Sequence, residues 1–428
     1  MSALLLAAFL AAAPGGATPA GPSTRFALHA SKALIASLDG PQALDDAIVV
    51  VKDGKIERVV AAREFAPEAG LDVLDVRPNW VAPGFVDLHS HVGGNGGDIN
   101  DMVLQLNTGL RVSPTVVPEN EELQRAAAAG VTTILYIPGS GTNIGGAGIL
   151  LKTALPTFEG MRVRDPGSLK IAQGDNPTRW GYGMGRGMMN YHIRTELARG
   201  MGYAKRRAAK EAGHARDIRF DVFDDLLAKR TQVSTHTQIY ALVSYTLQII
   251  RREFGIDVYI DHGEWKGYLA TEEALELGVA AICGPREIDA PGGRSMDYDG
   301  RITGIAGEYQ RRGMKLVGFN TDAPVVPQDE LFLQASMGTR YGFDGREMQG
   351  VRGLTIVPAK VAGIDARVGS LEAGKDADLI VVSGDPLDPR SRIERVFIEG
   401  RLVHEAEPAR AARSSFGAPT ALDSSRRR

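Results

Sequence analysis

Two histidines placed two residues apart give the clearest chemical signal in the sequence. His89 and His91 end the apolar run FVDLHSH, and side chains two apart on a strand point to the same face. Three further donors, His236, His262 and Asp322, close the apolar runs QVSTH, VYIDH and KLVGFNTD. Imidazole nitrogen combined with some carboxylate oxygen is the donor set that zinc and its neighbours prefer. The pattern therefore predicts a divalent metal site.

The elements that would position these donors are short strands alternating with helices. From about residue 81 to residue 362, apolar strand-like runs are separated by helical patterns such as ALVSYTLQIIRREFG. Such alternation is typical of parallel βα units, and eight of them closed into a barrel fit this length. The carboxyl ends of all strands in such a barrel meet at one face. The sequence thus predicts an α/β fold, a (β/α)8 barrel, with the donors gathered at its mouth.

Both ends of the chain differ from this central region. Residues 26–60 and 377–403 read as short strands, with Asp53-Gly54 and Glu399-Gly400 at turns. Two outer segments have little to contribute to a core. Residues 1–20 combine an apolar stretch with small residues, which predicts a signal peptide and a periplasmic or secreted protein. Residues 408–428, rich in Ala, Ser and Arg, predict a disordered tail.

Composition limits the classes of function. A chain of 428 residues exceeds the usual single core of about 250 to 300 residues, which favours one barrel with an accessory domain. Hydrophobic residues at 43% and charged residues at 24% are close to the globular average. The net charge of -3, with acids and bases interspersed, provides no basic surface for nucleic acid or anionic lipid. We expect a small-molecule substrate, no nucleic acid and no membrane anchor, and leave homo-oligomerisation open.

The order of these motifs resembles the amidohydrolase superfamily, especially its imidazolonepropionase-like and dipeptidase-like branch. The resemblance rests on FVDLHSH, the later histidines, NTDAP and the closing VGSLEAGKDADLIVVSGDPL. It implies a metal-dependent hydrolase barrel at 81–362, flanked by a small β-sandwich built from 21–80 and 363–407. One departure is Ala323 after Asp322, where many relatives carry histidine, and it bears on substrate choice.

The resemblance also implies roles for individual residues. His89 and His91 would bind one metal, His236 and His262 the other or a shared site, and Asp322 would ligate metal while moving a proton. Binuclear members bridge two ions with a lysine carboxylated by carbon dioxide.

Lys152, which closes NIGGAGILLK, is the best match to that lysine. A carbamate would turn its repelling cation into a bridging anion. The alternative is an unmodified lysine at a strand end, and the site would then hold one ion.

Three further residues are candidates for binding substrate. Glu264 and Trp265 directly follow His262, and His192 follows the Gly- and Met-rich stretch WGYGMGRGMMNY. The alternatives are that Glu264 is a carboxylate at the rim, that Trp265 packs against the protein, and that the stretch before His192 is a surface loop.

The predicted site suits hydrolysis of a C–N bond. A divalent ion lowers the pKa of bound water to about 7 and polarises a carbonyl. Asp322 would act as general base and then as general acid. We expect a small peptide, an acylated amino acid or a cyclic amide as substrate, and zinc as the metal, with manganese, iron or cobalt also compatible. Alternatives are a deaminase or lactonase acting on a nitrogen heterocycle or ester-type ring, and a non-catalytic binding protein on a degenerate barrel.

Overall fold

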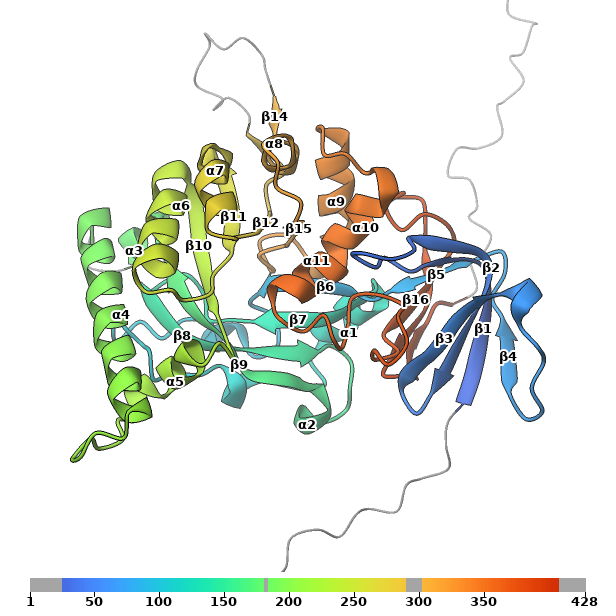
Figure 1. Ribbon diagram of the computed structural model, residues 1–428, viewed down its shortest axis with the longest axis horizontal. Helices are drawn as coiled ribbons and strands as arrows, with labels where there is room; N and C mark the ends of the chain where they lie inside the picture. The colour runs from blue at the N-terminus through green and yellow to red at the C-terminus, as the bar shows by residue number, and fades with distance from the viewer. Residues whose placement is uncertain (1–24, 181–183, 290–301, 408–428) are drawn as a thin grey trace, which may run out of the picture.

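The computed structural model describes residues 25–180, 184–289 and 302–407, which form a barrel with a second sheet beside it (Figure 1). The predicted signal peptide at 1–20 and the predicted disordered tail at 408–428 lie outside these residues. Within the described ranges, none of the helices has the length and hydropathy needed to cross a membrane.

The barrel is one eight-stranded sheet whose strands follow the order β15-β12-β11-β10-β9-β8-β7-β6. A bridge between Ser90 and Ala323 links the two end strands, so the sheet is nearly closed and the predicted barrel fold is confirmed. The strands are β6 (Phe85–Ser90), β7 (Val131–Tyr136), β8 (Ile144–Lys152), β9 (Arg162–Ala172), β10 (Val233–Ile239), β11 (Ile260–Trp265), β12 (Ala281–Cys283) and β15 (Val317–Phe319).

One strand departs from the expected parallel arrangement. β8 pairs antiparallel with both β7 and β9, whereas the other neighbouring pairs in this sheet are parallel. Lys152, the last residue of β8, therefore lies opposite Thr133, near the start of β7. The carboxyl end of β8 is at the amino-terminal face of the barrel, away from the carboxyl ends of its neighbours.

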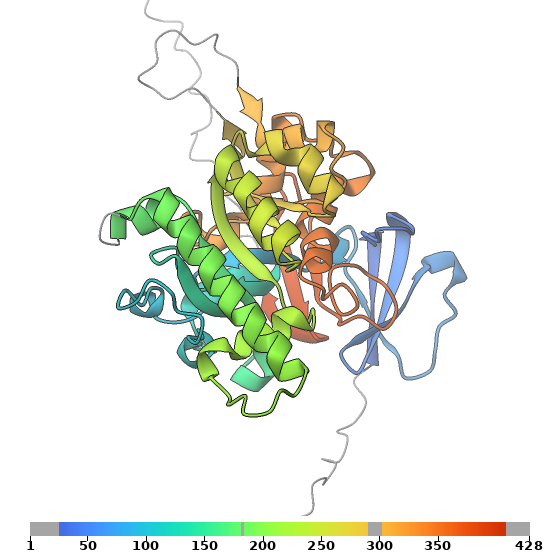
Figure 2. The same cartoon turned by 60° about the vertical axis from the view of Figure 1, so that its left-hand side comes forward.

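Helices cover the outside of the barrel, and Figure 2 shows α4 crossing its outer surface. Ile193 and Leu197 of α4 pack in one buried cluster with Leu169 of β9 and Val233 of β10. The helices are α1 (Glu121–Ala128), α2 (Phe158–Met161), α3 (Asp175–Trp180), α4 (Arg186–Ala208), α5 (Asp221–Leu227), α6 (Tyr240–Thr246), α7 (Thr271–Glu276), α8 (Ile305–Arg311), α9 (Leu331–Arg340), α10 (Gln349–Leu354) and α11 (Ile356–Val361). A short hairpin, β13 (Ile288–Asp289) with β14 (Thr303–Gly304), lies between α7 and α8 in the chain.

The second sheet combines strands from both ends of the chain, in the order β18-β17-β16-β5-β1-β2-β3, with β4 also paired to β1. Its strands are β1 (Arg25–Leu34), β2 (Ala43–Lys52), β3 (Lys55–Ala61), β4 (Asp72–Asp75), β5 (Trp80–Pro83), β16 (Leu379–Val382), β17 (Ile393–Ile398) and β18 (Arg401–Glu405). The antiparallel pair of β5 and β16 joins the two ends. Both predicted turns are present, with positive φ at Asp53, Gly54, Glu399 and Gly400. The domain boundaries proposed from sequence stay predictions.

Candidate metal centre

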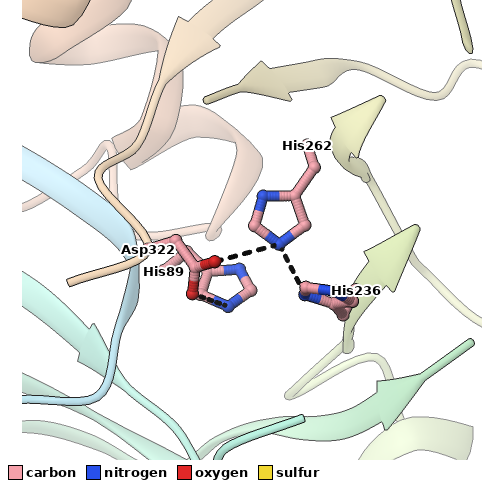
Figure 3. Close-up of side chains that lie close together, drawn as sticks. All are labelled: His89, His236, His262 and Asp322. Atoms are coloured by element: carbon pink, nitrogen blue, oxygen red, sulfur yellow. Dashed lines mark hydrogen bonds and ion pairs between the residues drawn. The ribbon is translucent and has the colours of Figure 1, made fainter. Parts of the chain in front are cut away.

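Histidines from three strands of the barrel and an aspartate that follows a fourth strand meet in one buried cluster. One ligand atom from each of His89, His236, His262 and Asp322 lies within 4.8 Å of the others (Figure 3). His91 adjoins them, with Nε2 at 3.2 Å from Asp322 Oδ1. The structure therefore brings together the five donors that the strand ends predicted.

The ring nitrogens of three histidines are oriented by acceptors outside the cluster. Nδ1 is at hydrogen-bond distance from Asp261 in His89 (2.8 Å), from the Ile137 carbonyl in His91 (2.9 Å) and from the Gly284 carbonyl in His262 (2.6 Å). Because a carbonyl or carboxylate oxygen accepts, Nδ1 is the donor in each ring. Each Nε2 is then left with a lone pair that points toward the cluster.

These inward lone pairs fit a cation. His262 Nε2 lies 2.9 Å from His236 Nδ1, and Asp322 Oδ1 lies 3.2 Å from His89 Nε2. Each of these close contacts needs a proton or a metal ion between its two atoms. Burial lowers the pKa of His89 and His262 to about 4, with the Lys170 cation adding to the effect at His89. The imidazoles are thus neutral at physiological pH, which is the form that binds metal.

Two of the donors sit on a strained backbone. His262 has φ 69° and Asp322 has φ 48°, in the left-handed region that non-glycine residues seldom adopt. Such a conformation costs of order 1 to 3 kcal/mol and concentrates at functional sites. Here it occurs where β11 and the segment after β15 reach the cluster.

Asp322 is an ionised carboxylate in this setting. Burial alone would raise its pKa, but its interactions with His89, His91 and His262 outweigh burial and hold the pKa well below the ordinary value. An ionised carboxylate next to the metal donors can accept a proton from a reacting group, which is the role expected for it.

Two buried aspartates that the sequence analysis missed support the histidines. Asp261 contacts His89 and accepts a hydrogen bond of 3.1 Å from Asn320 Nδ2. Asp87 accepts hydrogen bonds from the His89 backbone N–H and from the Thr321 hydroxyl. Burial raises the pKa of each aspartate to about 7. A carboxylate inside an apolar strand, as in FVDLHSH and VYIDH, was the signal available for both.

A lysine at the cluster was also missed. Lys170 of β9 is fully buried, and its Nζ lies 2.9 Å from His89 Nε2. Burial lowers the pKa of Lys170 to about 8, although Asp261 and Asp322 act in the opposite direction. The run SLKIA, with one cation among apolar residues, was the available signal, but it was not recognised as a barrel strand.

The assignment of Lys152 to the metal site was wrong. Its Nζ contacts Asp378 and lies 3.0 Å from Asp376 Oδ2, both just before β16. The assignment assumed that every strand of the barrel runs in the same direction. Because β8 is reversed, its last residue faces the second sheet and forms ion pairs there.

The three candidates for substrate binding have different surroundings. Glu264 is fully buried on β11 and lies 3.2 Å from Arg286 Nη1. Trp265 is 36% exposed, and the Arg286 guanidinium lies 5.4 Å from its ring centroid. His192 is on α4 beside Tyr191, with ring centroids 6.1 Å apart, and the metal-donor cluster does not include it. Substrate binding by these residues stays a prediction.

Comparisons with known proteins agree with this geometry. The model of the amidohydrolase family matches residues 302–403. Amidohydrolase tasK of Hapsidospora irregularis is 24% identical over 400 residues, which are 81% of this chain but 38% of tasK. Imidazolonepropionase of Sphingopyxis alaskensis is 23% identical over 390 residues, 82% of this chain and 90% of that protein. The crystal structure of an amidohydrolase from Thermotoga maritima matches with a TM-score of 0.78 and 27% identity, covering 89% of this chain and 100% of that one.

Proposed function

Because this chain belongs to the amidohydrolase superfamily, we propose that it is a metal-dependent hydrolase that cleaves a C–N bond in a small substrate. A small peptide or an acylated amino acid is the substrate class that we favour, with a cyclic amide next. The convergence of four imidazoles and one carboxylate in a buried cluster carries this proposal. A degenerate binding protein would have lost some of these donors, and all five are in place.

The residues of the site have distinct roles in this reaction. The four histidines and Asp322 would hold one or two divalent ions, which lower the pKa of bound water toward 7 and polarise the scissile carbonyl. Asp322 takes the proton from the attacking water and returns it to the leaving nitrogen. Asp261 fixes the ring of His89, so that Nε2 stays directed at the cluster.

Lys170 is the residue that we propose as the carboxylated bridge. Its neutral amine would attack the carbon of carbon dioxide and lose a proton, which forms a carbamate anion. A pKa of about 8 leaves part of the amine neutral near physiological pH, and His89 lies within 2.9 Å. With Lys152 excluded, a site for a single ion and a deaminase-like reaction would gain support. A carboxylated Lys170 would instead support a site that holds two ions.

Arg286 supports a substrate that carries a carboxylate. Its side chain is half exposed, and its contacts with Glu264 run through Nη1. A guanidinium has five N–H donors in a planar fork that matches a carboxylate, so the remaining donors can reach a substrate. Trp265 lies under this guanidinium and would contact an apolar part of the same molecule. Zinc as the ion, export and oligomerisation remain predictions.

Metal content and a substrate screen test the proposal together. The purified protein, reconstituted with zinc and bicarbonate, is compared by plasma mass spectrometry with the double variant His89→Ala, His91→Ala. A matched control is His29→Ala, His404→Ala, because both histidines belong to the second sheet. We expect about two ions per chain in the wild type and the control, and loss in the first variant.

The screen compares dipeptides and N-acyl amino acids with their C-terminal amides. Hydrolysis of the free acids in preference to the amides is the expected result. Absence of metal after reconstitution would contradict the hydrolase assignment itself. Bound metal with deamination or lactone hydrolysis, and without cleavage of these amide substrates, would contradict the substrate class alone.

A further inference from the structure

Asp322 lies at the seam of the barrel, where the two end strands of the sheet meet. Among the described residues, the two edges pair through a single bridge between Ser90 and Ala323, with a hydrogen bond of 2.8 Å from the His91 backbone N–H to the Ala323 carbonyl. A regular ladder therefore does not hold the segment that carries Asp322. Its φ of 48° is nevertheless a conformation that surrounding contacts have to maintain.

A network of buried side chains crosses the seam beside this bridge. Asp87 Oδ2 accepts hydrogen bonds from the Thr321 hydroxyl at 2.6 Å and from Gln328 Nε2 at 3.1 Å. Asp87 Oδ1 accepts a hydrogen bond of 3.0 Å from the His89 backbone N–H. Gln328 Oε1 in turn accepts a hydrogen bond of 2.9 Å from the Ser90 hydroxyl. The segment after β15 is thus joined to β6 by side chains.

This network reaches both neighbours of Asp322. The Thr321 hydroxyl donates to Asp87 and accepts a hydrogen bond of 3.1 Å from the Ala323 backbone N–H. The residues on either side of Asp322 are therefore tied to each other and to β6. Rotation of the Asp322 backbone out of its left-handed conformation would separate these neighbours. The carboxylate would then leave its place 3.2 Å from His89 Nε2.

Gln328 contributes to this network without contacting the metal donors. In the described part of the chain, the hydrogen bonds of its side chain go to Asp87 and Ser90. An amide suits this place because Nε2 donates to the carboxylate while Oε1 accepts from the hydroxyl. An apolar side chain of similar shape would leave both partners without these bonds. The Asp87 carboxylate would then be free to turn away from Thr321.

We propose that Gln328 is a positioning residue that holds Asp322 in place through Asp87 and Thr321. The inference rests on the proposed function, in which Asp322 ligates metal and moves the proton. A misplacement of about 1 Å can cost about a hundredfold in rate even when its cause is remote. Groups that orient metal ligands change metal affinity about tenfold to a hundredfold. Loss of the Gln328 amide should therefore weaken both metal binding and proton transfer.

Gln328→Met tests this role, because methionine has a similar volume and lacks the amide. Gln334→Met is the matched control, since Gln334 is also buried, on α9, and takes no part in the network. Competition with a chelator should show zinc binding about tenfold to a hundredfold weaker in Gln328→Met. Zinc affinity in the control should stay within about twofold of the wild type. Equal affinities in the two variants would overturn the proposal.

Kinetics at saturating zinc provide a second readout, with N-acetyl-L-phenylalanine as the amide probe. In Gln328→Met, kcat should fall about tenfold to a hundredfold while KM stays within about threefold. Cleavage of p-nitrophenyl acetate should fall less, because p-nitrophenolate leaves without a proton. A merely structural role would lower the amount of folded enzyme and leave kcat per bound zinc unchanged. That result, or equal losses on the two probes, would contradict the role in proton transfer.

Thr321→Val and Thr321→Ser provide a test that does not depend on the folding of Gln328→Met. Only serine retains the hydroxyl that links Asp87 to the Ala323 N–H. The valine variant should lose zinc affinity and kcat as Gln328→Met does, whereas the serine variant should stay within about threefold of the wild type. Equal values in the two variants would break the proposed connection from Gln328 to Asp322.

The same measurements separate this inference from the proposed function. A wild type that binds zinc but cleaves neither probe would contradict the substrate class, and the zinc affinities would still decide the role of Gln328. A wild type that binds no zinc would contradict the hydrolase assignment and this inference together.

Discussion

Two lysines on neighbouring strands of the barrel are fully buried, but in opposite surroundings. Lys152 contacts the carboxylates of Asp376 and Asp378, whereas the Nζ of Lys170 lies beside the imidazole of His89. The first cation is neutralised by its partners. Lys170, in contrast, lies beside imidazole and carboxylate groups that could bind a metal ion, and burial lowers its pKa to about 8. Burial alone therefore does not tell a structural lysine from a reactive one, and the contacting groups do.

The direction of the strand accounts for the difference. β9 is parallel to β10, and Lys170 lies opposite Ser234, two residues before His236. β8 runs the other way, so its last residue reaches the second sheet. Lys55 and Arg367 contact Asp376 as well, which makes the Lys152 region a network of ion pairs between the barrel and that sheet.

The largest effect that separates the two lysines is on activity. Lys170→Met should lower kcat/KM about a thousandfold and remove one of two bound ions, because the bridging anion would be lost. Its melting temperature should change little. Steady-state kinetics and metal analysis check this outcome, with Lys152→Met as the matched control. Normal activity and metal content in Lys170→Met would show that Lys170 does not bridge the ions and has only a structural role.

The second effect is on stability. Lys152→Met removes the cation that contacts the buried Asp378, while Asp376 keeps Lys55 and Arg367, and the free energy of unfolding should fall by about 3 kcal/mol. Its folded fraction should keep wild-type kcat and metal content. Chemical denaturation measures the loss, and adding Asp378→Asn to Lys152→Met should recover part of it. An unchanged unfolding free energy would mean that these ion pairs are not needed to join the two sheets.

A smaller effect concerns the carboxylates that contact His89 and Lys152. Asp261→Asn removes the carboxylate that orients His89 and should weaken metal binding about tenfold to a hundredfold. Asp376→Asn, at the other lysine, should leave the affinity unchanged. Competition with a chelator measures both. Equal affinities in the two variants would show that the orientation of His89 does not depend on Asp261.

The smallest effect, counted per pH unit, is on the free energy of unfolding of the metal-free protein. Burial lowers the pKa of His89 and His262 to about 4, below the 6.5 of free histidine. At these two positions the unfolded chain binds more protons between these values, so the contribution of the two histidines to stability should fall as pH decreases from 6.5 to 4. Asp87 and Asp261, with pKa raised to about 7, contribute in the opposite direction over this range. The slope is up to about 1.4 kcal/mol per pH unit for each histidine.

Urea denaturation at a series of pH values measures that slope. His89→Ala, His262→Ala should make the slope between pH 4 and 6.5 smaller than in the wild type, whereas Asp376→Asn should leave it unchanged. Burial raises the pKa of Asp376, but Lys152 and its other cationic partners outweigh burial and hold the pKa below 3.8. The contribution of Asp376 is therefore present above pH 3.8 and is lost only below it. A slope that is the same in the histidine variant and the wild type would refute the assignment to the two histidines.

Local sequence patterns were sufficient to predict the donors of the cluster and two of the turns. The gathering of the five candidate metal donors could be predicted because each follows an apolar run, and the ends of parallel strands meet at one face wherever they lie in the sequence. The turns at Asp53-Gly54 and Glu399-Gly400 were likewise predictable, since two adjacent residues set their backbone conformation.

Tertiary structure decided the rest. An apolar run has the same periodicity whether its strand is parallel or antiparallel, so GILLK and SLKIA look equivalent in sequence. Pairing with β7 and β9 sets the direction of β8, and only that pairing separates Lys152 from Lys170. The carboxylates that neutralise Lys152 lie more than 220 residues later in the chain, and no local signal indicates such a partner. The sequence by itself thus determined which residue types gather at the mouth of the barrel, and the long-range pairing of strands determined which lysine joins them.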